Sequence, residues 1–503
     1  MKKIYILSAV ALGLATASCD DYLDINTDPN APSAEVVTSD MIMPAVEMNL
    51  AASYGDFMRI TGGYFAQHYA QEFGTSNYVD YSAFYISATR SSSTYTQMMQ
   101  RVLGNAQTII EKSVAQGDNG TLLAATTLRV FAYQALVDCY GEVPFSEAFG
   151  SSSSPAYDNG KDIYEALIAE LDAAIAQASA GDVVCTNFLY PGEKADKWIQ
   201  FANSLKLRLL TRSVDKLSAQ QSNLDALVAE GNFITSDVQW AGCWTSEAGS
   251  ESPFYAEEFA TNFGSTQINV VPNIAILGTM IQGTYTDPRV AAFWTTGSNG
   301  NYNGYISSNT QILQGTVDAS GTTCDAAYFS RPVASYDMPV VILSLSDVEF
   351  YLAEYYAKKN DATNAAAHYA AAVQASFDAS GVPGADANIA QFPYDQSNWK
   401  KVIGVAKWVA NAGFNGFEAW CEMRRLDYPT FENPSVSGAN FDNGSVLDPS
   451  SYVPGTIYTP KNVRSEIGAN KLLERWPYAE SSTARNANAP TFPGHTVPVF
   501  WAE

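Results

Sequence analysis

The sequence predicts a mainly α-helical protein, in which pairs of helices form a scaffold that carries long irregular loops and few short strands. Apolar residues recur at helical spacing on both sides of a long irregular middle segment. The helical segments also come in neighbouring pairs. The composition agrees, because 47% apolar and 16% charged residues in a chain of 503 residues are typical of globular proteins and exclude an intrinsically disordered chain.

Four helix pairs are expected, each broken by a short turn. They are 98–116 with 122–140, 163–178 with 196–215, 346–359 with 362–377, and 398–412 with 414–426. In the third pair, small and aromatic side chains alternate as they do in tetratricopeptide units. Since the pairs are irregularly spaced, we predict a scaffold of tetratricopeptide-like helix pairs rather than a regular repeat array.

Helical periodicity disappears between Gly231 and Pro339, where Gly, Asn, Ser, Thr and aromatic residues predominate. One helix is predicted in this stretch, from Pro272-Asn273 to about Gln282. Segment 429–464 has a similar composition. Because long ordered loops of this kind usually carry function, we expect them to pack on the helical scaffold and to form the functional site.

The N-terminus is typical of a bacterial lipoprotein. Residues 1–18 form a signal peptide, with a basic start, an apolar stretch and small residues directly before Cys19. Residues 19–40 are predicted to be the lipidated N-terminus and a tether, and 41–503 a single domain. The apolar stretch is shorter than a spanning helix, and no later segment is expected to cross a membrane. The alternative is an ordinary soluble exported protein.

Five further cysteines follow Cys19, at positions 139, 185, 243, 324 and 421. An odd number cannot form a complete set of disulfides, although two bridges and one free thiol are possible. Cys139 and Cys421 lie within apolar helical patterns, so we expect them to be small buried hydrophobic residues. The spacing of the cysteines offers no metal-binding pair.

Several classes of function are disfavoured by composition and motifs. A net charge of −24 without any basic run argues against nucleic acid as a partner. The chain has no nucleotide-binding, hydrolase or metalloprotease motif, and its three histidines lie far apart, so we expect no cofactor, no metal and no enzyme activity. A glycosidase needs only two carboxylates, which keeps Glu247, Glu251, Glu257 and Glu258 as candidates against the alternative of a solvated acidic face.

Aromatic residues within polar loops are the stronger indication of a binding site. Sugar rings stack their C–H faces on aromatic rings while their hydroxyls bond polar side chains, so this mixture favours a carbohydrate ligand. The alternative is that these rings fasten the loops to the core. Three loop segments supply the candidates, which are Asn77, Tyr78, Tyr81 and Tyr85 in the first, Trp240 and Trp244 in the second, and Trp294, Asn301, Tyr302 and Tyr305 in the third.

Four stretches of the chain resemble the SusD/RagB family of surface lipoproteins, which partner SusC-like TonB-dependent transporters in Bacteroidetes. These stretches are 128–148, 198–208, 417–425 and 475–480, the last followed by Asn486. Acidic residues directly after Cys19 also resemble a signal for export to the outer face of the outer membrane. As patterns, the first three are amphipathic helix faces and the fourth is a turn, so they indicate fold rather than ligand.

The resemblance implies an α-rich domain on four tetratricopeptide-like pairs, anchored by lipid at the outer-membrane surface. It also implies a hinged lid that captures a nutrient for the transporter and performs no chemistry itself. Relatives bind glycans in most cases and peptides in others, which leaves an oligosaccharide as the expected ligand and a peptide as the alternative.

Overall fold

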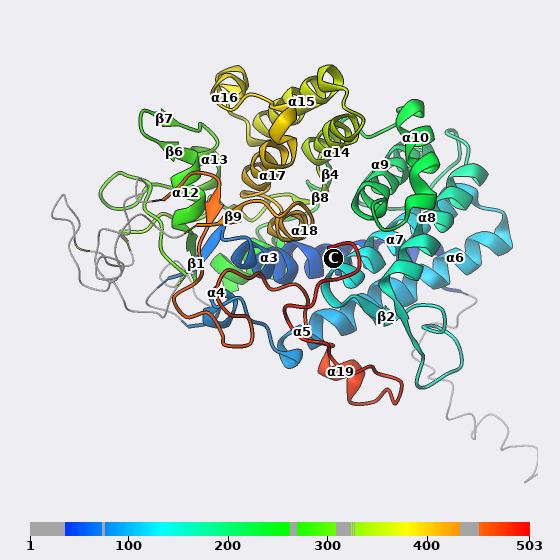
Figure 1. Ribbon diagram of the computed structural model, residues 1–503. Helices are drawn as coiled ribbons and strands as arrows, with labels where there is room; N and C mark the ends of the chain where they lie inside the picture. The colour runs from blue at the N-terminus through cyan, green and yellow to red at the C-terminus, as the bar shows by residue number, and fades with distance from the viewer. Residues whose placement is uncertain are drawn as a thin grey trace, which may run out of the picture.

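Helices form most of the secondary structure, as the sequence predicts (Figure 1). The structure is a computed structural model that describes residues 36–72, 76–261, 269–307, 323, 325, 327–432 and 452–502. The helices of eight or more residues are α2 (Ser39–Ala52), α5 (Ala88–Thr96), α6 (Gly104–Gln116), α7 (Asn119–Tyr140), α8 (Gly160–Gln177), α9 (Ala195–Ser213), α10 (Gln221–Glu230), α14 (Leu345–Lys358), α15 (Ala362–Ser380), α17 (Trp399–Ala410) and α18 (Gly416–Leu426). Shorter helices that matter below are α3 (Arg59–Phe65), α4 (Val79–Ser82), α12 (Ile274–Met280), α16 (Ala385–Gln391) and α19 (Glu480–Thr483).

All four predicted helix pairs are confirmed. They are α6 with α7, α8 with α9, α14 with α15, and α17 with α18, and the members of each pair are in contact. The first helix of the first pair is longer than predicted, since α5 continues through the π-helical segment η2 (Gln97–Leu103) into α6. The helix expected near Pro272 is also present, as α12. Asn273 caps it by accepting a hydrogen bond from the backbone N–H of Ala275.

The strands of the described residues are short and form five two-stranded ladders. The antiparallel ladders are β1 (Tyr69–Gln71) with β5 (Val270–Pro272), β2 (Glu142–Pro144) with β3 (Tyr157–Asn159), β4 (Val238–Trp240) with β8 (Val340–Leu343), and β6 (Ile281–Gln282) with β7 (Tyr285–Thr286), and the parallel one is β9 (Thr430–Phe431) with β10 (Thr456–Ile457). They fasten loops to the helices rather than forming a sheet core.

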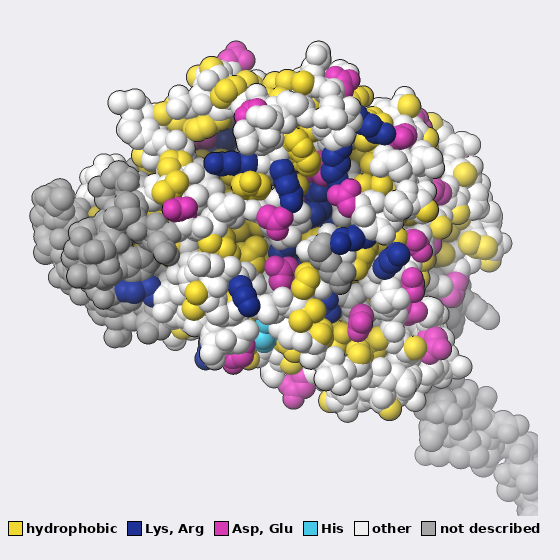
Figure 2. Space-filling model, in the orientation of Figure 1, with side chains coloured by type: hydrophobic (Ala, Val, Ile, Leu, Met, Phe, Trp, Pro, Cys, Tyr) yellow, Lys and Arg dark blue, Asp and Glu magenta, His cyan; other side chains and the backbone are white. Residues whose placement is uncertain are grey.

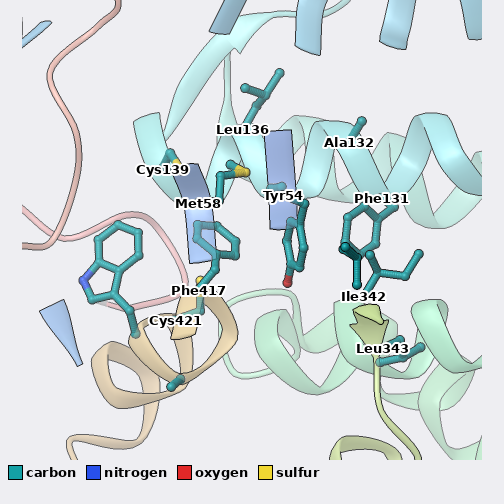
Figure 3. Packing of buried hydrophobic residues seen from close by; sticks show 14 of the residues in the cluster. Tyr54, Met58, Phe131, Ala132, Leu136, Cys139, Ile342, Leu343, Phe417 and Cys421 are labelled. Carbon is teal, nitrogen blue, oxygen red and sulfur yellow. The ribbon is translucent and has the colours of Figure 1, made fainter. Parts of the chain in front are cut away.

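Helix α7 is the centre of the core, because every residue from Gly120 to Tyr140 is buried. Among the described residues it is the one helix long and apolar enough to span a membrane, which corrects the prediction that no such segment follows the signal peptide. Its burial on all sides identifies it as a core helix. Figure 3 shows how its neighbours pack, with the Tyr54 ring centroid 5.0 Å from that of Phe131 and 5.5 Å from that of Phe417.

Helices α3 and α18 cross at glycines. A Cβ atom at Gly62 would lie 2.4 Å from the Cα of Phe417, and one at Gly416 would lie 2.5 Å from the backbone nitrogen of Gly63. No real Cβ is found so close to backbone. The two glycines therefore set how closely helices α3 and α18 approach each other.

A buried network of charges lies between the helix pairs, with Arg212 of α9 at its centre. Its guanidinium contacts Asp138 at 2.6 Å and Glu422 at 2.8 Å, and it also forms an ion pair with Glu418. Burial alone would raise the pKa values of the two glutamates, but the surrounding cations, with Arg212 among them, outweigh burial and lower both pKa values.

The four family-like stretches meet at this network. Asp138 belongs to the first stretch, Glu418 and Glu422 belong to the third, and Arg208 at the end of the second lies 3.7 Å from Glu418. The fourth is attached by backbone, since the N–H of Trp476 donates to the carbonyl of Cys139 at 2.7 Å. The residues that carry the resemblance are thus the ones that hold the scaffold together.

The predictions for the cysteines differ in outcome. Cys139 and Cys421 are fully buried, as expected, while Cys185 and Cys243 are half-buried, and all four are free thiols. Two disulfides are therefore excluded. Cys19 and Cys324 lie outside the described residues.

Candidate functional site

A surface cluster around Tyr85 is the best candidate for a binding site, and it consists of Tyr85, Asp80, Arg464, Phe492 and His495. The guanidinium carbon of Arg464 lies 4.9 Å from the centre of the Tyr85 ring, and the His495 ring centroid lies 5.0 Å from it on an edge-to-face geometry. Arg464 also forms an ion pair with Asp80, in which both side chains are nearly half exposed. The Tyr85 cluster thus combines rings with accessible polar groups.

The chemistry of the Tyr85 cluster suits hydroxyl-rich ligands. The Asp80 carboxylate accepts hydrogen bonds and Arg464 donates them. Partial burial lowers the pKa of His495, which favours its neutral ring, and the Nδ1 atom of that ring is buried. Figure 2 shows basic, acidic and hydrophobic side chains interspersed on the face over α4 and α5. An aromatic face bordered by such donors and acceptors is the arrangement that sugars require.

Only part of the first predicted segment is accessible. Tyr85 is half-buried and Asn77 is exposed, but Tyr78 and Tyr81 are 5% and 2% exposed. The rings of Tyr78 and Tyr81 stack with centroids 5.5 Å apart, and the Tyr78 hydroxyl donates to Glu258 at 2.6 Å. These two tyrosines fasten the loop to the core and have no face free for a ligand, which corrects their assignment as binding residues.

The third predicted segment likewise contains both buried and accessible residues. Trp294 and Tyr305 are buried, at 1% and 0% exposure, so neither can stack on a sugar in this structure. The Trp294 ring packs against Tyr69 at 5.9 Å, and the Tyr305 ring packs against Phe329 at 5.0 Å. Asn301 is exposed and Tyr302 is half-buried, and both remain accessible from solvent.

The first and third segments converge beneath the surface rather than on it. Tyr64 contacts the rings of Tyr78 at 5.5 Å and Tyr69 at 6.0 Å, and Tyr69 in turn contacts Trp294 at 5.9 Å. This row of buried rings connects α3 and β1 with Trp294.

The second segment lies elsewhere. Trp240 is fully buried on β4, which pairs with β8 rather than with β1, and Trp244 is half-buried and donates its indole N–H to the carbonyl of Trp240 at 3.1 Å. Figure 1 places β4 and β8 behind the helix pairs, away from β1 and α4. The structure therefore does not bring this segment into the Tyr85 cluster.

The acidic residues considered for glycoside hydrolysis differ in their exposure to solvent. Glu247 is exposed, Glu251 accepts the backbone N–H of Gly249, and Glu257 is half-buried. Glu258 is wholly buried, and burial raises its pKa to about 7. Since its carboxyl binds Tyr78 inside the core, it cannot reach a glycosidic bond in this structure. The described residues also hold no group of three or more side chains that could bind a metal ion.

Sequence reasoning missed most of the Tyr85 cluster. Asp80 was visible only as part of the first aromatic segment, while Arg464 comes from the end of the irregular stretch 429–464 and His495 from the C-terminal tail. No local pattern connects positions that are nearly 400 residues apart. It also missed several cavities, and three of them, of about 320, 310 and 260 Å³, are bordered by helices of the scaffold.

Comparison with known proteins identifies both a family and a fold. Residues 29–451 match the model of a SusD-like family described as starch-binding and associating with the outer membrane. No curated protein matches the chain.

Solved structures resemble this fold over nearly their whole length. A SusD homologue from Bacteroides uniformis is 21% identical, with a TM-score of 0.71 over 91% of this chain and 98% of that one. Another from Bacteroides thetaiotaomicron is 18% identical, with a TM-score of 0.69 over 93% and 99%. A chitin-binding SusD homologue from Flavobacterium johnsoniae is 20% identical, with a TM-score of 0.68 over 91% and 98%. At such identities the similarity shows a shared fold.

Proposed function

Because the chain belongs to the SusD-like family, we propose that it is a nutrient-binding lipoprotein of the cell surface that binds a neutral oligosaccharide and passes it to a SusC-like TonB-dependent transporter. The observation that carries the ligand class is the Tyr85 cluster, in which an accessible ring is bordered by Asp80, Arg464 and His495. Since the Asp80–Arg464 pair is neutral as a whole, it favours hydroxyls over a charged ligand.

Some of the predicted residues fit this proposal as additional contacts. Asn77 has an exposed side chain and precedes α4, while Tyr85 follows α4. Asn301 and Tyr302 are also accessible. Trp244 is accessible too, but it would make a separate contact with a ligand, because it follows β4, which lies apart from the Tyr85 cluster.

Capture rather than catalysis is the role that fits these contacts. The ring and its polar neighbours are arranged to hold a ligand, and none of the three cavities contains two unpaired carboxylates. Cys19, the proposed lipid anchor, lies outside the described residues, and the first described helix, α2, begins at Ser39.

The binding site can be tested with the soluble protein starting at residue 20. Isothermal titration with starch and chitin oligosaccharides should find a ligand, and Tyr85→Ala should weaken its binding about 10-fold or more because the stacking face is lost. Tyr336→Ala is the matched control, since Tyr336 is 40% exposed and is not in the Tyr85 cluster. Equal affinity in the two variants would refute the site.

The transport role needs a separate experiment. Purification of the lipidated protein from its native membrane in mild detergent should yield a large β-barrel partner in near-equal amount. Mass spectrometry of the small molecules in the same sample identifies the cargo. Peptides without any glycan would replace the proposed ligand and keep the lid role, while protein that is repeatedly isolated alone would contradict the lid role.

A further inference from the structure

The largest of the three cavities, about 320 Å³, lies within the helical scaffold and not at the Tyr85 cluster. It is bordered by α15, α16 and α17 on one side and by α12 and the segment around Pro454 on the other. Figure 1 shows α15 and α16 on the upper side of the molecule, with α17 below them, and α4 and α5 on its lower side. The cavity and the Tyr85 cluster are therefore separate places on the molecule.

The polar groups at the floor of the cavity already have partners. Arg289 forms a buried ion pair with Asp287 at 2.7 Å and donates to the hydroxyl of Ser376 at 2.8 Å. The Asn388 amide donates to Asp287 at 3.0 Å, and Tyr369 donates to the carbonyl of Phe392 at 2.8 Å. Because these groups bond one another, the floor has little hydrogen-bonding capacity left for sugar hydroxyls.

The walls of the cavity are apolar. They are formed by side chains from two helices and two loop segments, which are Val373 of α15, Val402, Val405, Ala406 and Val409 of α17, Phe392 and Pro393 after α16, and Pro454 before β10. A volume of this size is at the lower end of the range for small-molecule sites in proteins. The part of a ligand that would fill this cavity is thus a compact apolar group, such as an aromatic ring or a branched aliphatic chain.

One basic side chain, that of Lys401, lies at the rim of the cavity. Lys401 lines the cavity and is exposed, and within the described part of the chain it has no acidic partner within 4.0 Å, whereas its neighbour Lys400 pairs with Asp427 at 2.7 Å. Lys401 also lies in the first turn of α17, which contains no acidic residue. The positive end of the helix and the ammonium group favour an anion at the same place.

We propose that this cavity is a second binding site, which takes a small anion with an apolar body, such as an aromatic or branched-chain carboxylate. The apolar body would fill the space between Val373 and Val405, and the carboxylate would meet the ammonium group of Lys401. The proposal does not depend on the glycan-binding function, because the two sites share no residue.

The probe for this site is 8-anilinonaphthalene-1-sulfonate, an aromatic anion whose fluorescence rises in apolar surroundings. We expect one molecule to bind per wild-type chain. Val405→Trp should abolish binding by filling the cavity. Lys401→Gln should weaken it at least fivefold, while Lys400→Gln, the matched control, should leave it unchanged. Circular dichroism and melting temperature would establish that each variant is folded.

A competition experiment needs no variant. 3-Phenylpropionate should displace the probe from the wild-type protein, and 3-phenylpropanol, which has the same ring without the charge, should displace it at least fivefold less well. Probe binding that survives Val405→Trp would overturn the location of the site. Equal displacement by the acid and the alcohol, or an absence of probe binding, would overturn the ligand class.

Discussion

Replacement of Arg212 by methionine should destabilise the fold strongly, because it removes the cation at the centre of the buried network. The Arg212 side chain is 0% exposed and serves Asp138, Glu418 and Glu422 together. Methionine keeps much of the length and volume of the side chain and none of its charge. The substitution therefore tests the charge and not the packing.

The expected loss of unfolding free energy follows from the ion pairs that remain after Arg212 is replaced. Glu422 keeps Lys407 at 3.1 Å, and Glu418 keeps Arg208 at 3.7 Å. Asp138 keeps no side-chain cation within 4.0 Å in the described structure, although the Trp501 indole still donates to it at 2.8 Å. A buried carboxylate that loses its cation costs about 3–5 kcal/mol of unfolding free energy.

The assay is urea denaturation of the soluble protein, followed by tryptophan fluorescence at pH 8 and at pH 5. The Glu422 contribution of the wild type should be the same at pH 8 and at pH 5, because the surrounding cations outweigh burial and hold the Glu422 pKa below its usual value. Its contribution to stability is present above about pH 4.5 and is lost as the pH falls through the lowered pKa.

The control for Arg212→Met is Lys400→Met. Lys400 forms an exposed ion pair with Asp427, with 42% and 76% of the two side chains accessible, so its loss should cost no more than about 1 kcal/mol. A difference below about 1 kcal/mol for Arg212→Met at pH 8 would refute the reasoning, since it would mean that the network contributes no more than a surface pair.

Three further predictions follow from burial and from the N-terminus. Trp294→Ala should lower the unfolding free energy by about 3–5 kcal/mol because Trp294 is a core residue, and a variant that melts like the wild type but loses ligand would contradict its burial. Burial raises the Glu258 pKa to about 7, so its contribution to stability is complete below pH 4.5 and is lost as the pH rises through 7. Glu258→Gln should therefore flatten the decline of melting temperature between pH 5 and pH 9, and an unchanged slope would show that another group causes the decline. Cys19→Ser should move the protein from the membrane fraction to the soluble fraction, and a variant that stays with the membrane would refute the lipid anchor.

The sequence by itself located the four helix pairs of the scaffold, although it did not predict α2, α3 or α10. Helical periodicity located all four helix pairs and α12, because a helix that packs on a core must repeat its apolar residues every three to four positions. Cys139 and Cys421 were assigned to the core on the same basis. The stretches that carry the family resemblance could also be recognised in the sequence. They supply charged residues to the buried network, and replacing those residues would leave unpaired charges in the core.

The tertiary structure alone decided which aromatic residues face solvent. In an irregular loop no period links position to burial, so Tyr81 and Tyr85 look alike in the sequence although one is in the core and the other is accessible. Their neighbours settle the difference, and those neighbours are distant in the chain. Arg464 reaches Tyr85 only because the loop that carries it folds back over α4, where the backbone N–H of Arg464 donates to the carbonyl of Ala83 at 3.3 Å. A site assembled from such long-range contacts leaves no local pattern to read, because each of its residues is placed by packing elsewhere.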